Sequence, residues 1–222
     1  TTPPDMYYEY RPMNFRQVNA SICDTAGNLL FYTNGIYVAN ALNEPMENGQ
    51  ELNPGPHAQQ NQEYGYILTQ GAMILPLPEQ DSLYYLLHTD KVEPINGLVF
   101  HTRNFYFTLV NMNEDAGKGS VIMKNQVFLN DVLDMGKIAA AKHANGRDWW
   151  VILRKYETNQ YYKACLTSTG LTLVNLQPVG IPIPSNSIGQ AVFSPDGSKY
   201  ANVNFTGTGG DPIYVSIYDF DR

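Results

Sequence analysis

The feature of this sequence that most restricts its fold is a pattern that recurs four times: an apolar run, a short polar turn and a second run rich in aromatic residues. If Gly27, Asp81, Gly146 and Gly197 are equivalent positions in these turns, the repeats are spaced 54, 65 and 51 residues apart. Repeats of about this length, made of short strands, are typical of β-propellers, in which each blade is a small antiparallel sheet.

The recurring runs are expected to form hairpins. Their sequences are VNASICD-TAGN-LLFYTNG, GAMILPLP-EQDS-LYYLLHTD, KIAAAKHA-NGRD-WWVILRKY and GQAVFSPDG-SKYANVNF. Two more runs follow the second hairpin, FYFTLVNMN and SVIMKNQVF, and two follow the third, YYKACLTST and LTLVNLQPV. Because turn signals at short and regular spacing predict antiparallel strands, each repeat is expected to form a four-stranded sheet.

The repeats therefore predict an all-β fold, a single partial β-propeller of four-stranded blades, with about four blades present and the last one incomplete. The blades are expected at residues 14–66, 67–131, 132–184 and 185–222. The first strand of each blade carries alanines, which suits the crowded centre of a propeller. The composition agrees, since 16 Tyr, 9 Phe, 18 Gly and 14 Pro favour strands and tight turns.

One segment disagrees locally with this prediction. Residues 132–146 read VLDMGKIAAAKHANG, which is rich in alanine and ends in Asn-Gly, so intrinsic propensity alone predicts a helix. The alignment of the repeats instead places the segment opposite AVFSPDG, and a strand-like run, WWVILRKY, follows it. We therefore expect a strand here.

Charge and hydropathy exclude two classes of function. The chain has 14 Lys and Arg against 21 Asp and Glu, a net charge of −7, and its basic residues are scattered, so nucleic-acid binding is not expected. No stretch approaches the roughly 20 apolar residues that cross a bilayer, so membrane insertion is not expected either.

A domain of this size can bury a sufficient core without disulfides, so Cys23 and Cys165 need not pair.

Several segments resemble known propellers. FSPDGSKYA, residues 193–201, resembles the inner hairpin of WD40-like and TolB-like propeller repeats. A longer set, made of residues 19–55, QGAMILPLP, KHANGRDWWVI, FSPDGSKYA and IYDFDR, resembles the N-terminal propeller of large secreted proteins of Bacteroidota-type bacteria that carry a sorting domain for type IX secretion. The resemblance implies export, a place at the cell surface and a propeller longer than this chain.

The C-terminal run IYVSIYDFDR is expected to be the third strand of the last repeat. We therefore expect a fragment of a larger propeller, completed by a protein partner, by further copies or by another chain, because propeller edges are paired by closure.

Tyr8, Tyr10, Tyr64 and Tyr66, with Tyr7, lie between repeats, and the segment from Met46 to Gln70 reads as a long surface loop. Exposed tyrosines there would suit protein or carbohydrate contacts.

No catalytic residue is assigned, since HExxH, CxxC, GxSxG, P-loop and GxGxxG motifs are all missing from the sequence. The candidate ligand contacts at one mouth of the central channel are His143, Asn145, Arg147 and Asp148 in KHANGRDWW. The preferred interpretation of this segment is nevertheless a plain hairpin turn, in which Asn145 and Gly146 adopt positive φ angles and Asp148 pairs with Arg147 or the backbone.

Acidic residues recur at the inner turns, at Asp24, Asp81, Asp148 and Asp196. Paired carboxylates could serve a glycosidase. A residue type repeated at the same turn of every repeat is instead expected to satisfy backbone N–H groups, since a catalytic pair occurs once.

No metal or other cofactor is expected. His88, His101 and Asp90 could form a zinc site, but the preferred interpretation places them at the polar ends of adjacent strands. Residues 111–119, NMNEDAGKG, resemble a calcium loop in composition but not in spacing, which favours a hairpin turn and leaves a weak calcium site as the alternative.

Two tripeptides, Asp24-Thr25-Ala26 and Asp81-Ser82-Leu83, are similar to the acceptor used for O-glycosylation in that bacterial group, which makes Thr25 and Ser82 candidate sugar carriers.

The sequence leaves two functional hypotheses. The first is a secreted or cell-surface, non-enzymatic propeller that acts as a structural or adhesive protein-interaction module. The alternative is an extracellular glycan-active hydrolase or lyase with its site at the channel mouth near His143.

Overall fold

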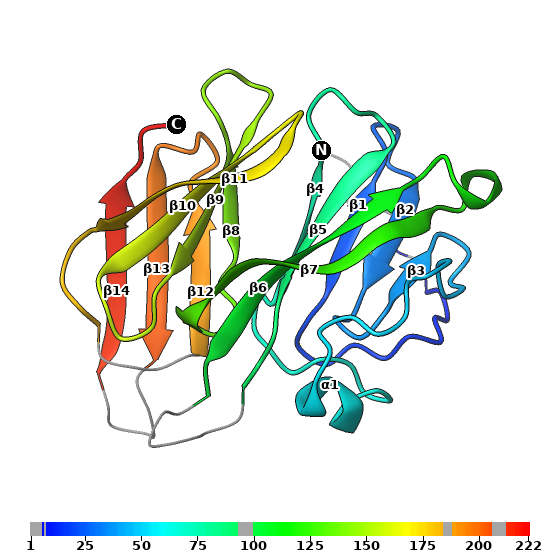
Figure 1. Cartoon of the computed structure of the whole chain (residues 1–222), viewed down its shortest axis with the longest axis horizontal. Helices are drawn as coiled ribbons and strands as arrows, with labels where there is room; N and C mark the ends of the chain where they lie inside the picture. The colour runs from blue at the N-terminus through cyan, green and yellow to red at the C-terminus, as the bar shows by residue number, and fades with distance from the viewer. Residues whose placement is uncertain (1–5, 7, 93–99, 184–187, 206–211) are drawn as a thin grey trace.

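The computed structural model describes residues 6, 8–92, 100–183, 188–205 and 212–222. This part of the chain contains four antiparallel sheets, none of them closed into a barrel, and one short α-helix. Within each sheet the strands lie side by side in sequence order, and in Figure 1 sheet 4 lies at the left, sheet 1 at the right and the other two between them.

The sheets are numbered 1 to 4 along the chain. Sheet 1 consists of β1 (Ala20–Cys23), β2 (Leu29–Thr33) and β3 (Val38–Asn40). Sheet 2 consists of β4 (Ala72–Pro76), β5 (Leu83–Thr89), β6 (Thr102–Asn111) and β7 (Ser120–Leu133). Sheet 3 consists of β8 (Ala139–Lys142), β9 (Trp149–Arg154), β10 (Gln160–Thr167) and β11 (Gly170–Pro178). Sheet 4 consists of β12 (Ile188–Phe193), β13 (Lys199–Phe205) and β14 (Ile213–Asp219).

The all-β prediction and the four hairpins are confirmed. The helix suggested by local propensity within residues 132–146 does not form, since Ala139–Lys142 is strand β8, paired with β9. The physical reason is packing on both faces. Ala140 packs toward sheet 2 and Ala139 toward sheet 4, and small side chains let the two sheets approach this strand closely.

Sheet 1 differs from the expected four strands, because it has three. The chain after β3 nevertheless runs back along that strand, where the Val38 N–H donates to the Gly49 carbonyl and the Met46 N–H to the Val38 carbonyl, both at 2.9 Å. Sheet 4 also has three strands in the described residues.

The segment from Met46 to Gln70 is not the surface loop that the sequence suggested. Its apolar residues Met46, Leu52, Tyr66 and Leu68 are all buried, and it contains the helix α1 (Pro56–Gln60). The sequence does not reveal this burial because these residues are widely spaced among Gln, Asn, Pro and Gly, so no periodic apolar pattern marks them.

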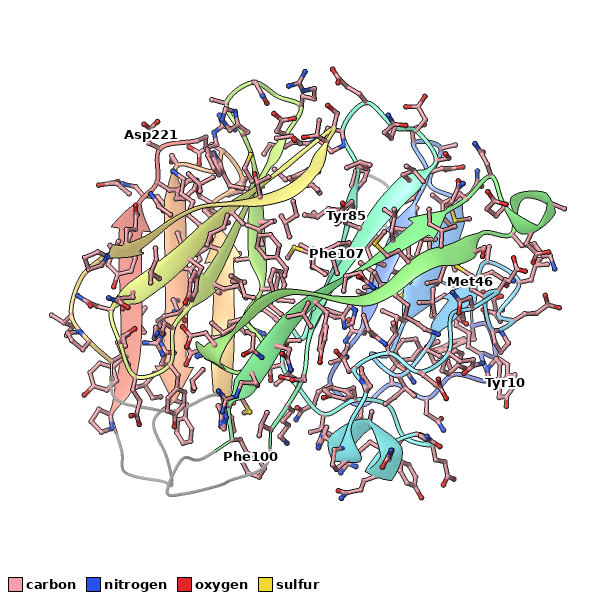
Figure 2. The ribbon with its side chains drawn as sticks, in the orientation of Figure 1. Tyr10, Met46, Tyr85, Phe100, Phe107 and Asp221 are labelled. Carbon is pink, nitrogen blue, oxygen red and sulfur yellow. The ribbon has the colours of Figure 1, made fainter. Side chains whose placement is uncertain are left out.

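The core lies between stacked sheets. Leu87 and Phe105 of sheet 2 pack in one cluster with Val151 and Leu166 of sheet 3, and all four side chains are fully buried. Tyr85 belongs to the same cluster and stacks on Phe107 at 5.1 Å between ring centroids (Figure 2). Similar clusters join sheet 1 to sheet 2 and sheet 3 to sheet 4. The inner sheets thus pack on both of their faces, although their last strands are exposed, β7 in part and β11 for most of its length.

Gln70, just before sheet 2, bonds to the first strand of sheet 4. Its side-chain amide donates to the Ala191 carbonyl at 3.0 Å and accepts from the Ala191 N–H at 2.7 Å. We expect Gln70→Ala to lower the free energy of unfolding by about 1–3 kcal/mol, because two partly buried backbone groups lose their partners. Urea denaturation measures this, with exposed Gln17→Ala as the control. Equal stability of the two variants would show that this link contributes nothing.

Candidate functional site

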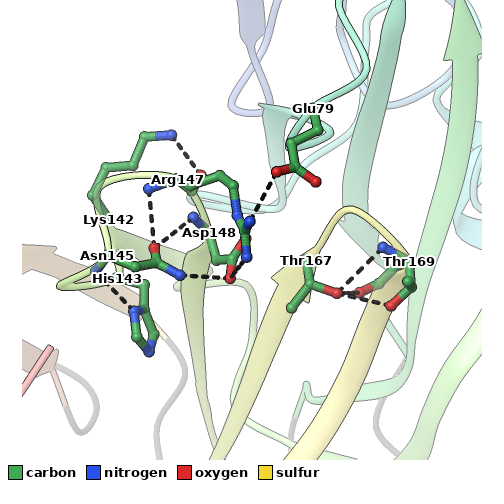
Figure 3. A network of polar contacts seen from close by, with 9 residues as sticks. Glu79, Lys142, His143, Asn145, Arg147, Asp148, Thr167 and Thr169 are labelled. Carbon is green, nitrogen blue, oxygen red and sulfur yellow. Dashed lines mark hydrogen bonds and ion pairs between the residues drawn. The ribbon is translucent and has the colours of Figure 1, made fainter.

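The four residues predicted at the channel mouth lie together in the turn that joins β8 to β9 (Figure 3). The His143 N–H donates to the Asp148 carbonyl at 2.9 Å and closes the turn. The Asn145 side-chain oxygen accepts the N–H groups of Arg147 and Asp148, both at 3.0 Å. Of the pair Asn145 and Gly146, only Gly146 has a positive φ angle, of 73°.

The predicted hairpin turn is present and Asp148 pairs with Arg147 as expected, but the prediction of two positive φ angles is wrong, since only Gly146 has one. The connection is a wider loop in which the side chain of Asn145, rather than its backbone, organises the turn. An Asn side chain commonly bonds to the backbone two residues further on, which is an alternative way to stabilise a tight turn.

Arg147 links this turn to the preceding sheet. Its guanidinium donates to Asp148 at 2.9 Å and to Glu79, in the β4–β5 turn of sheet 2, at 2.8 Å (Figure 3). The hydrogen bond from Arg147 holds the pKa of Asp148 below its usual range. Asp148 therefore stays ionised, whereas a glycosidase acid needs a raised pKa to hold its proton. The Arg147 side chain thus joins the β8–β9 turn to the β4–β5 turn.

The other polar groups of the turn also have contacts there. The Lys142 ammonium donates to the Arg147 carbonyl at 3.0 Å and lies 3.8 Å from the centre of the Trp149 ring. The His143 ring packs on Trp150 at 4.8 Å between centroids. These contacts hold the turn in one shape.

A crevice of about 380 Å³ opens beside this turn, where the first strands of sheets 3 and 4 meet. It is lined by the alanines of β8, by Ala191 of β12 and by Met73 of β4. Its charged lining residues are Lys142 and Arg222. A crevice with small apolar walls and two cations lacks the carboxylates that acid-base chemistry on a glycan requires.

Two of the four recurrent acidic residues satisfy turn backbone groups as predicted. Asp24 accepts the N–H groups of Ala26 and Asn28 at 2.9 and 2.8 Å. Asp196 accepts the Ser198 N–H at 3.0 Å, and hydrogen bonds from Ser194 and Ser198 lower its pKa to about 2. Asp148 instead bonds to side chains, so the prediction does not extend to it.

The histidine pair considered for zinc lies near sheet 2, and His88 is fully enclosed. Its Nδ1 lies 2.6 Å from the Asn53 side-chain oxygen, and its Nε2 lies 2.9 Å from the Thr108 hydroxyl. Asp90 accepts the N–H groups of Arg103 and Asn104 at 2.7 and 3.0 Å. Among the described residues, no three His, Cys, Asp or Glu side chains are grouped as a metal ion would require.

The remaining sequence candidates lie on turns. Thr25 is exposed in the β1–β2 turn, and Ser82 is partly buried in the β4–β5 turn, where its carbonyl accepts the Met112 N–H at 2.8 Å. The loop with calcium-like composition contains the short 3₁₀ helix η1 (Asp115–Gly117), and Lys118 pairs with Asp115 there at 3.0 Å. Cys23 and Cys165 are both free thiols, as the sequence allowed.

Tyr8, Tyr10 and Tyr64 are exposed as predicted, whereas Tyr7 lies outside the described residues. Tyr66 is the exception, because its side chain is 1% exposed. It packs with Val18, Leu68 and their neighbours below sheet 1.

The most unusual surface of the molecule is the outer face of sheet 4, a feature that the sequence did not single out. The strand registers place three side chains of β12 and four of each of β13 and β14 on this face, and at one end of it Lys199 of β13 pairs with Asp219 of β14. The other nine are Ile188, Gln190 and Val192 from β12, Ala201, Val203 and Phe205 from β13, and Ile213, Val215 and Ile217 from β14. We name these nine residues the outer face.

Five of the nine are large aliphatic side chains exposed by more than half, with Ile217 at 67%. Together they present on the order of 500 Å² of apolar surface, which is the size at which exposed patches mark interaction sites. The opposite face of the same sheet packs on sheet 3 through Ala191 and Tyr200. The alternation of Ile213, Val215 and Ile217 with polar or aromatic neighbours was the sequence signal for this face.

Comparisons with protein-family models, with curated proteins and with solved structures found no match. In the described part of the chain, the one α-helix is far too short to span a bilayer.

Proposed function

We propose that this chain is part of a secreted or cell-surface β-propeller that acts, without catalysis, as a protein-interaction module. The observation that carries this proposal is the outer face of sheet 4, whose nine side chains are uncharged and which is bordered at one end by the paired charges of Lys199 and Asp219. The four successive antiparallel sheets support the propeller assignment, and the resemblance of the sequence to secreted propellers supports export.

The structure of the core indicates what kind of partner would cover this face. On sheet 2, the residues Leu75, Tyr85 and Leu87 form the face that sheet 3 covers. The outer face of sheet 4 has the same alternating apolar side chains, but no sheet formed by the described residues lies on it. A β-sheet from a partner or from a second copy would therefore pack there at the usual spacing of about 10 Å.

The glycan-hydrolase alternative gains no support at the channel mouth. Asp148 and Glu79 share one guanidinium, and the pKa of Asp148 is lowered rather than raised. An interaction module is the better interpretation, since it needs only the exposed surface.

Self-association tests the proposal. With no other partner present, the face can cover itself, because its nine side chains are uncharged and the charges beside it, Lys199 and Asp219, pair within each copy. Face-to-face packing would bury about 1,000 Å² in total, which is the lower end of a specific interface. We expect sedimentation velocity to show dimerisation of the native chain at micromolar concentrations and a monomer for Val215→Asp, with an unchanged melting temperature.

The matched control is Val127→Asp, at a position of similar exposure on β7, which should dimerise like the native chain. A native chain that stays monomeric at about 100 μM, or a Val215→Asp variant that still dimerises, would contradict the proposal.

A further inference from the structure

A second surface, on the far side of the molecule from the outer face, has the features of a ligand site. It is a groove of about 760 Å³ between the β2–β3 turn, the helix α1 and β7. Figure 1 shows α1 beside β3, with the chain before the helix passing between them. The volume is within the range of small-molecule sites in proteins.

The floor of the groove, formed by Glu51 and Asn125, is held with neighbouring residues in an unusual backbone conformation. Glu51 and Asn125, and the adjacent Asn48 and Asn53, all have positive φ angles, between 51° and 62°. For Glu51 a positive φ angle costs on the order of 1 kcal/mol. Residues in such strained conformations cluster at binding sites, where the surrounding structure holds their backbone in place.

Hydrogen bonds to β7 hold this floor. The Asn125 side chain donates to the Glu51 carbonyl at 2.8 Å and accepts the Asn53 N–H at 3.2 Å. The buried His88 bonds to the Asn53 side chain at 2.6 Å. Asn48 donates to the Val121 carbonyl at 2.7 Å, so sheet 2 fixes the loop at several points. The groove is therefore formed before any ligand arrives.

The lining of the groove carries one cation, Lys124, and one carboxylate, Glu51, and is otherwise uncharged and rich in amides. The side chains of Gln50, Gln59 and Gln62 line it, are exposed, and make no hydrogen bond to any described residue. The Lys124 ammonium lies 3.1 Å from both oxygens of Asn48 and is thereby occupied. Glu51 is the only carboxylate in the lining, so no acid-base pair is present there.

We propose that this groove binds a neutral oligosaccharide. Each glutamine amide offers one acceptor and two donors, which match the neighbouring hydroxyls of a sugar ring. The Tyr37 ring, which lines the same groove, offers a flat apolar surface with a polar tip for the C–H face of a sugar. A sugar without charge fits a lining in which a single cation and a single carboxylate give no net charge.

An extended peptide fits the groove less well. A peptide usually binds by adding a strand to a free sheet edge. The edge of β3 that faces this segment is already used, since the N–H groups of Leu52 and Val38 donate to the Ile36 and Gly49 carbonyls in this part of the chain, both at 2.9 Å. Side-chain amides remain as the main polar groups of the groove.

The test is titration of the native chain with a panel of neutral hexasaccharides, made of β-glucose, mannose, xylose and N-acetylglucosamine units, followed by calorimetry and by the NMR signals of the glutamine amides. We expect at least one sugar to bind with a Kd of about 0.1–1 mM. The double variant Gln59→Ala/Gln62→Ala should weaken it at least tenfold. Gln60→Ala, on the same helix but outside the groove lining, is the matched control and should leave binding unchanged.

Three results would overturn the proposal: no hexasaccharide bound at about 5 mM, binding that survives the double variant, or binding of a (Gly-Ser)₅ peptide in place of the sugars with the same dependence on Gln59 and Gln62. Because the groove and the outer face share no residue, Val215→Asp should not change sugar binding. The two proposals can therefore fail separately.

Discussion

Replacement of Asp134 by Asn is expected to lower the free energy of unfolding by about 3–5 kcal/mol, because it leaves two buried cations without their anion. Asp134 lies between β7 and β8, and its side chain is 2% exposed. Arg154 donates to it at 2.6 and 2.7 Å, and Lys137 lies 3.1 Å from the same oxygen. Burial lowers the pKa of Lys137, which shows how strongly this site disfavours uncompensated charge.

The cluster also joins two sheets. Lys137 and Arg154 both donate to the side-chain oxygen of Asn204, on β13, which is fully buried. Loss of Asp134 should therefore loosen the contact between sheets 3 and 4 as well as the turn itself. Urea denaturation with fluorescence detection measures the effect.

Two comparisons make the prediction specific. Asp219→Asn removes the anion of the Lys199 pair, where the side chains are 88% and 55% exposed, and should cost less than about 1 kcal/mol. Lys137→Met should cost less than Asp134→Asn, because the Asp134–Arg154 pair stays complete. If Asp134→Asn and Asp219→Asn proved equally mild, the cluster would not be the structural element that its burial indicates.

Acid should destabilise the chain through His88 at a pH where most carboxylates are still ionised. Burial lowers the pKa of His88 from 6.5 to about 3, so the folded chain keeps the ring neutral while the unfolded chain protonates it. The neutral form matches its partners, since Nδ1–H donates to the Asn53 side-chain oxygen and Nε2 accepts the Thr108 hydroxyl. The Thr108 oxygen in turn accepts the Asn125 N–H at 3.1 Å.

The sign of the effect follows from proton binding. The unfolded state binds one more proton between about pH 3 and 6.5, so stability is complete above pH 6.5 and falls as the pH falls, by about 1.4 kcal/mol per pH unit. We expect a loss of roughly 3 kcal/mol between pH 6.5 and 4.5, measured by urea denaturation at each pH.

His88→Gln should flatten this slope, whatever its own effect on stability, whereas His143→Gln, in the exposed β8–β9 turn, should leave it unchanged. NMR offers an independent reading, since the ring signals of His88 should not titrate until the pH falls below about 4. A His88 ring that titrates near pH 6.5 in the folded chain would disprove the prediction.

Local sequence signals predicted the strands well. The hairpins around Gly27, Asp81, Gly146 and Gly197 form as expected, because each joins an apolar strand to a turn that Gly, Asn or Asp stabilises. The competing helix at Ala139–Lys142 failed for a reason outside the segment, namely the sheets on both of its faces.

The candidate sites were predicted less well. The residues from His143 to Asp148 do lie together, as neighbours in one turn must, but the sequence could not show that Arg147 also reaches Glu79, 68 residues earlier. The sequence did not predict the groove for the same reason. Its floor depends on Asn125 and Asn48 bonding across 72 to 76 residues of sequence, and no local pattern encodes such a contact.

The sequence by itself determined the all-β class, the hairpins and their turns, because strand alternation and turn preference act over a few neighbouring residues. Only the tertiary structure decided which faces are covered. It buried Tyr66, His88 and Asp134 and left Val215 and Ile217 exposed, since burial depends on how sheets made from distant parts of the chain stack on one another. The surfaces proposed for function are the product of that stacking.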